Sequence, residues 1–356
     1  MKYIAYIGTY TEDNSHGIYM YELNTKSGEL TPIGFADKTV NPSYVTITDN
    51  KKFLYSVAET TEFQGTVGGG VAAFSIDNIE KRPKLINVQP TLGKHSCHII
   101  IDSTNKYIFV ANYSEGTVSQ FPVMEDGSIG ELMRTIKHIG SGPNKERQEM
   151  PHMHYVALTK NEKYLLTVDL GLDSVSLYRF EGGKGDMSLD EDASIVVAPG
   201  SGPRHLQFHP NNKYLYIVTE LSSEVIVYEF DSKSYKFKHM QTISTLPDNF
   251  KGNSTCAAIH INKEGNFLYA SNRGDDSIAV YKVEETGNLK LIEIMPTNGK
   301  TPRDFALDPT ESFLYSANQD SNEITAFLVD KEYGTLKPLD FKISINKPVC
   351  IKFLEV

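Results

Sequence analysis

Side chains that can transfer protons and bind anions stand at scattered positions along the chain: His154, Glu59, Glu220, and the arginines Arg204, Arg273 and Arg303. Imidazole titrates near neutral pH, so a histidine can accept and return a proton. Guanidinium groups carry fixed positive charge and bind carboxylate or phosphate through two parallel hydrogen bonds. These groups form a site only if the fold brings distant segments together.

A repeat that spans the chain supplies such a fold. A lysine-aromatic pair, or a relative of it, opens a short apolar segment seven times, and the aromatic positions are Tyr3, Phe53, Tyr107, Tyr164, Tyr214, Phe267 and Phe313. A period near fifty residues suits one four-stranded sheet per copy and is typical of a β-propeller. The sequence therefore predicts an all-β, seven-bladed propeller that occupies residues 1–356 as one domain.

The strands of a blade can be read from alternating apolar residues and from turn residues. In one copy, strands are expected at 204–208, 214–219 and 225–230, with a fourth around 239–244. Each copy then forms an antiparallel up-and-down sheet. The first copy lacks an inner strand and the chain ends in an unpartnered one at 347–353, so the two ends are expected to share a blade and close the ring.

Two sets of equivalent positions are predicted to surround one opening of the central channel. Counting back ten residues from each repeated aromatic reaches the start of the inner strand, at Ser43, Cys97, His154, Arg204, Ala257 and Arg303, with Val349 as the equivalent in the last strand. The ends of the neighbouring strands carry Glu59, Asn112, Asp169, Glu220, Asn272-Arg273 and Asn318-Gln319. Adjacent antiparallel strands place both sets on the same face, which predicts a charged pocket at the mouth.

Composition argues against several classes of partner. With 35 basic and 45 acidic residues the formal net charge is −10, which disfavours nucleic acid or an anionic membrane as the main partner. No segment approaches the roughly 18 consecutive apolar residues of a membrane span, and three cysteines give no disulfide framework. The amino terminus reads as a strand, so we expect a cytoplasmic protein; the oligomeric state stays open.

Several motifs resemble one known family. They are Tyr6-Ile7-Gly8-Thr9-Tyr10, the stretch from Gly142-Pro143-Asn144 through Arg147-Gln148 to Pro151-His152-Met153-His154, Gly202-Pro203-Arg204-His205, Thr219-Glu220-Leu221-Ser222-Ser223, and Ser271-Asn272-Arg273. Together they are similar to the seven-bladed lactonase propellers, which include propeller-type 6-phosphogluconolactonases and fungal 3-carboxy-cis,cis-muconate lactonizing enzymes.

The resemblance implies catalytic roles for His154, Arg204, Glu220 and Arg273. In lactone hydrolysis, water adds to the ester carbonyl and a proton must reach the departing alkoxide. We expect His154 as general base, Glu220 as an orienting group or as a proton relay with a raised pKa, and the two arginines as clamps for the carbonyl and the anion. Further substrate contacts are expected from Arg303, as a phosphate contact, and from His152, Asn272, Gln319 and Glu59.

The resemblance leaves three functions open. The favoured one is a 6-phosphogluconolactonase-type hydrolase of the pentose phosphate pathway, acting on a small anionic sugar lactone. The alternatives are a carboxymuconate lactonizing enzyme and a non-catalytic binding scaffold, since fold alone does not choose between them.

Two other motifs receive a structural reading. His152 and His154 are spaced to share one face of a strand, but the neighbouring arginines would repel a dication, so no metal and no cofactor are expected. Cys97 is expected to act as a small buried apolar residue rather than as a nucleophile.

Overall fold

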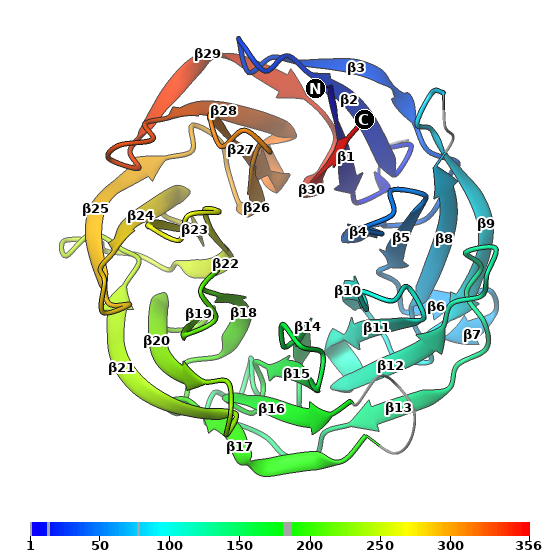
Figure 1. Ribbon diagram of the computed structural model, residues 1–356, viewed down its shortest axis with the longest axis horizontal. Coiled ribbons are helices and arrows are strands. Elements are labelled where there is room, and N and C mark those ends of the chain that lie inside the picture. Colours follow the sequence, from blue (N-terminus) through cyan, green and yellow to red (C-terminus); the bar gives the residue numbers. More distant parts are fainter. Residues whose placement is uncertain (1, 13–14, 77–78, 181–186) are drawn as a thin grey trace.

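Seven four-stranded antiparallel sheets surround a central channel in the computed structural model, which describes residues 2–12, 15–76, 79–180 and 187–356 (Figure 1). The prediction of a seven-bladed β-propeller is confirmed. In the part of the chain that the structure describes, no helix has the length and apolarity needed to cross a membrane.

The blades follow one another in chain order, and in six of them the inner strand comes first. The first two of these six blades consist of β4 (Val45–Ile47), β5 (Phe53–Ala58), β8 (Gly70–Ile76) and β9 (Pro83–Pro90), and of β10 (Ser96–Ile101), β11 (Tyr107–Asn112), β12 (Thr117–Pro122) and β13 (Arg134–Lys137). The next two consist of β14 (Met153–Leu158), β15 (Tyr164–Asp169), β16 (Ser174–Arg179) and β17 (Leu189–Val196), and of β18 (Pro203–Phe208), β19 (Tyr214–Thr219), β20 (Glu224–Asp231) and β21 (Lys236–Ser244). The last two consist of β22 (Thr255–Ile261), β23 (Phe267–Arg273), β24 (Ser277–Val283) and β25 (Leu289–Pro296), and of β26 (Pro302–Leu307), β27 (Phe313–Asn318), β28 (Glu323–Val329) and β29 (Leu336–Ser344).

The seventh blade is built from both ends of the chain. It contains β1 (Tyr3–Thr9), β2 (Ile18–Leu23), β3 (Leu30–Phe35) and, as its inner strand, β30 (Pro348–Glu355). β30 pairs with β1 in antiparallel register from Tyr3–Glu355 to Thr9–Pro348. The two termini therefore lie side by side in Figure 1, and the predicted ring closure is confirmed.

Short elements complete the architecture. A two-stranded hairpin, β6 (Glu62–Phe63) with β7 (Thr66–Val67), projects between β5 and β8. Two 3-10 turns, η2 (Tyr113–Glu115) and η4 (Gln319–Ser321), follow β11 and β27. Both turns leave the mouth-side end of the second strand of their blade.

Four of the repeated aromatic residues pack their blade against a glycine of the next: Phe53, Tyr214, Phe267 and Phe313. Phe53 on β5 contacts Gly127 in the turn between β12 and β13, where a Cβ would lie 2.1 Å from the ring. Tyr214 meets Gly287 of its following blade in the same way, at 2.5 Å. These glycines have positive φ, so a side chain there would be strained as well as crowded. The sequence period thus records a contact between blades.

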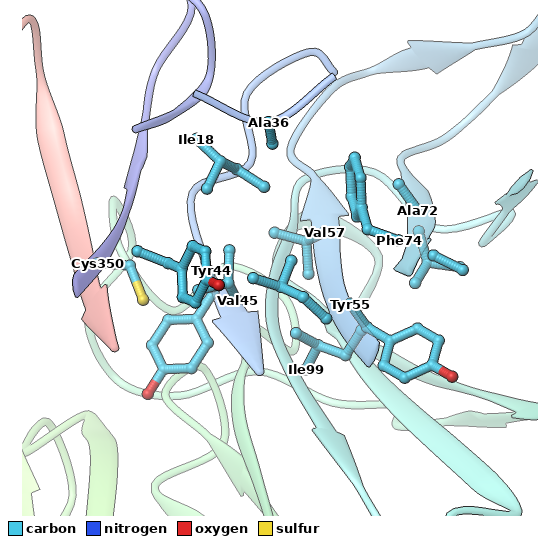
Figure 2. Close-up of a cluster of buried hydrophobic side chains, with 14 of the residues drawn as sticks. Ile18, Ala36, Tyr44, Val45, Tyr55, Val57, Ala72, Phe74, Ile99 and Cys350 are labelled. Carbon is cyan, nitrogen blue, oxygen red and sulfur yellow. The ribbon is translucent and has the colours of Figure 1, made fainter. Parts of the chain in front are cut away.

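The core lies between adjacent blades. Figure 2 shows one such cluster, in which Tyr44 and Val45 lie toward Cys350 of the closing blade and Tyr55 lies toward Ile99 of the following blade. Tyr55 is fully buried, and its hydroxyl donates a hydrogen bond of 2.9 Å to the carbonyl of Gly127. Apolar burial between blades fixes their order around the axis, and that order fixes which strand ends meet at the channel.

Candidate active site

A β-bulge aims the candidate residues of the inner strands into the channel. In β18, Pro203 pairs with Thr219 and His205 pairs with Val218, so Arg204 is an additional residue without a partner. Register shifts of the same kind leave His154 in β14 and Arg303 in β26 unpaired. A bulge re-aims a side chain and bends the strand. Counting residues had located these positions without revealing the bulge.

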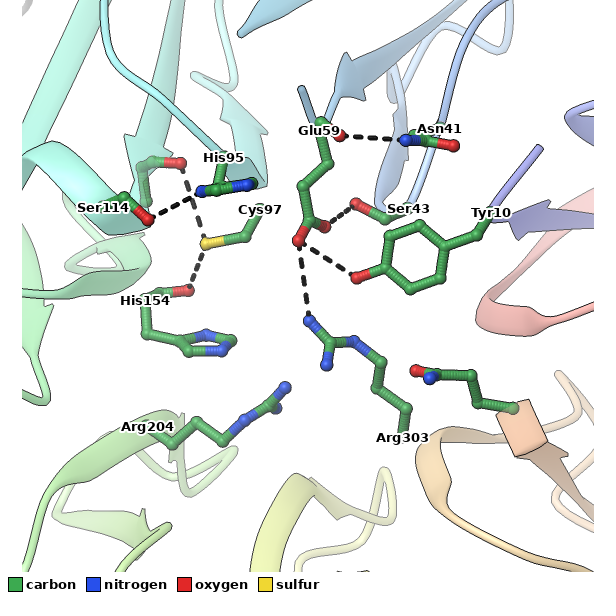
Figure 3. A network of polar contacts seen from close by, with 12 residues as sticks. Tyr10, Asn41, Ser43, Glu59, His95, Cys97, Ser114, His154, Arg204 and Arg303 are labelled. Carbon is green, nitrogen blue, oxygen red and sulfur yellow. Dashed lines mark hydrogen bonds and ion pairs between the residues drawn. The ribbon is translucent and has the colours of Figure 1, made fainter. Parts of the chain in front are cut away.

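The side chains converge on a cavity of about 340 Å³ at one mouth of the channel (Figure 3). Its lining consists of Tyr10, Glu59, His95, Cys97, Tyr113, Ser114, Arg147, His154, Glu220, Arg273 and Arg303. Arg204 lies directly beneath, beside His154 and Arg303. The sequence prediction that His154, Arg204, Glu220, Arg273, Arg303 and Glu59 share one opening is therefore met by the geometry.

Glu220 is the centre of a buried ion-pair network. Its Oε2 lies 2.8 Å from Nε of Arg204 and 2.8 Å from Nη2 of Arg273, and its Oε1 pairs with Arg147. Burial alone would raise the pKa of Glu220, but the charges of Arg273 and Arg204 outweigh it and hold this pKa well below its usual range. The expectation of a raised carboxyl pKa is wrong for this residue. Glu220 stays ionised at neutral pH, which favours its orienting role.

Arg204 is 1% exposed and donates hydrogen bonds through Nε and Nη1. Besides Glu220, it donates through Nη1 to the carbonyl of Ala257 at 2.6 Å and to Nε2 of His205 at 3.1 Å. Burial and the positive charge of Arg273 lower the pKa of Arg204 to about 10, so it remains a cation at neutral pH. Its position is fixed before any ligand binds.

His154 projects into the cavity from the bulge in β14 (Figure 3). Its Nδ1 is buried and has no hydrogen-bond partner among the described residues. Burial, reinforced by the charge of Arg204, holds the pKa of His154 well below its usual range. The imidazole is consequently neutral at physiological pH and has a lone pair available to accept a proton.

The opposite wall is formed by Glu59 and Arg303. Glu59 accepts hydrogen bonds from the hydroxyl of Tyr10, at 3.0 Å, and from Ser43. Nη2 of Arg303 lies 3.9 Å from Oε1 of Glu59, and its guanidinium carbon lies 5.7 Å from the centre of the Tyr10 ring. On this wall one carboxylate balances one cation.

Three residues predicted as substrate contacts do not line the cavity. His152 stacks on Tyr113 at 4.4 Å, and its Nδ1 lies 3.2 Å from the Tyr113 carbonyl oxygen, so it supports the wall from behind. Asn272 is fully buried, and its Nδ2 donates hydrogen bonds to the Thr245 carbonyl and to Oγ of Ser277. Gln319 donates to the carboxylate of Asp320 on η4.

Six lining residues were not among the predicted site residues: Tyr10, His95, Cys97, Tyr113, Ser114 and Arg147. Arg147 stands in the loop before β14, where no strand register gives its position. It belonged to the motif Gly142 to His154, and that motif was the only signal for it. Tyr10, His95, Tyr113 and Ser114 lie directly before or after strands, at the same mouth as the two predicted sets of equivalent positions, and Cys97 belongs to the first of those sets.

An aromatic and imidazole layer closes the channel beneath the cavity. The ring of His98 lies 3.8 Å from that of Tyr155 and 4.3 Å from that of Tyr44. His205 packs on Tyr155 at 4.7 Å. This layer gives the cavity a floor and shields Arg204 from solvent.

Cys97 has the surroundings of a structural group. Sγ of Cys97 lies 3.5 Å from the Met153 carbonyl oxygen, and burial raises the pKa of this thiol far above neutrality. Within the described ranges, no group of three or more His, Cys, Asp or Glu side chains is arranged to hold a metal ion.

A seven-bladed propeller with a charged cavity at its channel mouth defines a class of proteins that bind small polar ligands on the axis. Residues 4–353 match the model of the family described as "Lactonase, 7-bladed beta-propeller". The chain therefore belongs to the seven-bladed β-propeller lactonase family, as its motifs had indicated.

Curated and solved relatives agree with this assignment. A 6-phosphogluconolactonase of Bacillus subtilis is 43% identical over 99% of each chain. The crystal structure of a putative 6-phosphogluconolactonase from Bacteroides fragilis superposes with a TM-score of 0.92, at 35% identity, over 99% of this chain and 98% of that one. The periplasmic gluconolactonase of Pseudomonas aeruginosa gives a TM-score of 0.94 at 31% identity over 100% of both chains.

Proposed function

We propose that this protein is a lactone hydrolase that opens 6-phosphogluconolactone, as a step of the pentose phosphate pathway in the cytoplasm. Family membership sets lactone hydrolysis as its class of reaction, and the Bacillus subtilis relative carries the name of the phosphorylated substrate. The observation that carries the proposal is the imidazole of His154, whose Nδ1 has no hydrogen-bond partner among the described residues, in one cavity with the guanidinium groups of Arg147, Arg273 and Arg303.

His154 acts as the general base in this proposal. It takes a proton from a water molecule as the water oxygen adds to the lactone carbonyl carbon. The carbonyl oxygen becomes negatively charged, and the fixed cations Arg204 and Arg273 stabilise that charge because they are already in place before the reaction. The tetrahedral intermediate then breaks its bond to the ring oxygen, which receives the proton from the imidazolium.

Glu220 orients the arginines and does not carry the proton. A carboxylate held by three guanidinium groups has little tendency to accept a proton at neutral pH. Its negative charge permits two buried cations to lie next to the same oxygen. Removing Glu220 would leave Arg204 and Arg273 to repel each other at the site where the oxyanion forms.

The test is a direct rate measurement with the purified protein. Freshly generated 6-phosphogluconolactone is mixed with the protein, and acid release is followed against spontaneous opening, with carboxymuconolactone in a parallel reaction. Acceleration of the phosphorylated lactone supports the proposal. Failure to accelerate it, or a preference for carboxymuconolactone, would reject the assignment.

A further inference from the structure

The cavity has a rim whose residues take no part in the reaction described above. His95 comes from the loop before β10, Ser114 from η2, and Arg147 from the loop before β14, and all three line the same cavity as His154. They stand on one side of the mouth. Figure 3 shows His95 and Ser114 on the side of the cavity away from Tyr10.

The His95 and Ser114 side chains are held in place by local bonds. Nδ1 of His95 lies 2.6 Å from Oγ of Ser114, so the ring orientation is set and Nε2 is left for a ligand. His95 has a left-handed backbone with φ of 54°, and its N–H donates to the Thr60 carbonyl at 2.9 Å. A non-glycine residue in this conformation is held there by its surroundings at an energetic cost.

Arg147 provides a cation at the solvent edge. Its side chain is 39% exposed, and it uses Nη2 for Glu220. Guanidinium has five N–H donors, so the hydrogen bonds to Glu220 and Tyr113 leave donors for an anion. The loop is anchored by Gln148, which is fully buried and donates to the Leu170 carbonyl at 2.9 Å.

The charge balance of the cavity favours an anion on this side. Three guanidinium groups face the single carboxylate of Glu220, whereas Arg303 on the other wall is matched by Glu59. A forked guanidinium binds a phosphate dianion well, and His95 adds an Nε2–H donor when its Nδ1 accepts the hydrogen bond of the Ser114 hydroxyl. At the half-exposed rim it also loses less hydration than it would beside the buried Arg204.

We infer that Arg147, His95 and Ser114 form a subsite for the phosphate group of the substrate, with the lactone ring lying deeper, against His154. This inference rests on the proposed function and assigns the phosphate to Arg147 in place of Arg303. The subsite is expected to distinguish phosphorylated from unphosphorylated sugar acids by affinity.

The experiment measures the binding of 6-phosphogluconate and of gluconate by calorimetry. The wild-type protein is compared with Arg147→Gln and His95→Asn, and with the control Arg179→Gln, which removes an exposed cation of β16 that pairs with Asp190 outside the cavity. We expect the wild type to bind the phosphorylated acid at least about 30-fold more tightly, and Arg147→Gln to reduce that ratio at least about 10-fold. His95→Asn should reduce it by a smaller factor, and the control should preserve it.

Equal binding of both acids by the wild type, or an equal loss for both acids in Arg147→Gln, would overturn the subsite. Thermal unfolding of each variant verifies that it is folded. Because binding is measured without turnover, the two proposals fail separately. A protein that prefers the phosphorylated acid but does not open the lactone retains the subsite and loses the proposed function.

Discussion

The central residue of the site is a carboxylate whose work is electrostatic. Glu220 is 4% exposed and holds Arg204, Arg273 and Arg147 together. A buried ion pair is weak evidence for stability by itself, but removal of one partner leaves uncompensated charge in a medium of low polarity. We therefore expect that replacing Glu220 by the isosteric glutamine lowers the stability of the protein strongly.

Glu220→Gln is expected to lower the free energy of unfolding by about 3–5 kcal/mol at pH 7. Because the folded-state pKa of Glu220 lies below its unfolded value, its contribution is present above the unfolded pKa and is lost as the pH falls through the folded pKa. The thermal midpoints of variant and wild type should converge at low pH. Glu229→Gln, at an exposed position, is the control and should change stability by less than about 0.5 kcal/mol. Equal midpoints for Glu220→Gln and wild type at pH 7 would contradict this account.

His154 makes a second prediction at this scale. Its neutral form is the active one and its pKa is depressed by burial and by Arg204, so activity should be lost only when the pH falls well below 6.5. The profile of kcat/KM is best recorded with gluconolactone, which has no phosphate to titrate in this range. An acidic limb at or above pH 6.5 would show that the imidazole is not in the positively charged setting described.

At the scale of elements, the bulges at the heads of the inner strands decide which side chains reach the channel. The loop before the bulge of β18 is held by Asp173, which accepts hydrogen bonds of 2.7 Å from the N–H groups of Gly200 and Gly202. The carbonyl of Gly202 in turn accepts from the N–H of Glu220 at 2.6 Å. This loop therefore connects the positions of Arg204 and Glu220.

Two glycines of that loop offer a matched pair of substitutions. Both have positive φ, but a Cβ on Gly202 would lie 2.6 Å from Cγ of Leu221, whereas one on Gly200 would meet Pro143 at 3.6 Å. We expect Gly200→Ala to cost about 1 kcal/mol and Gly202→Ala about 2–4 kcal/mol, with a loss of kcat/KM only for the latter. Thermal unfolding and steady-state kinetics measure both effects. Similar behaviour of the two variants would mean that the loop does not position Arg204.

The sequence allowed the strands and their order to be predicted because period-two alternation and the repeated aromatics are local signals. It also placed His154, Arg204 and Arg303 at one mouth, since strand starts can be counted. The bulges were missed because each follows the first residue of its strand, so the alternation of the remaining residues does not reveal it. Arg147 was not identified as a site residue because its loop has no register, and the pKa of Glu220 depends on three cations from three separate segments.

At the scale of the molecule, closure of the ring is what makes the cavity possible. β30 supplies the inner strand of the blade that β1 begins, and the ring of Phe353 on β30 lies 5.7 Å from that of Tyr315 in the preceding blade. Without β30, the sheet edge of β1 would be exposed, and the blades on either side would lose their shared core. The positions of the six residues at the opening depend on that closure, although none of them lies on β30: Glu59, His154, Arg204, Glu220, Arg273 and Arg303.

Removal of residues 347–356 should prevent cooperative folding, whereas removal of Val356 alone should be tolerated because it lies beyond the end of β30. Circular dichroism during heating distinguishes the two: the protein without residues 347–356 should lack a sharp unfolding transition, and the control without Val356 should retain one. A sharp transition at an unchanged midpoint in the shorter protein would refute the role given to closure.

Lactone opening in this protein is attributed to the neutral imidazole of His154 at the channel mouth. The most direct measurement is kcat for 6-phosphogluconolactone in wild type and in His154→Ala. We expect kcat to fall by about 10²–10⁴-fold while the thermal midpoint stays close to that of the wild type. A variant with wild-type kcat would contradict the central claim.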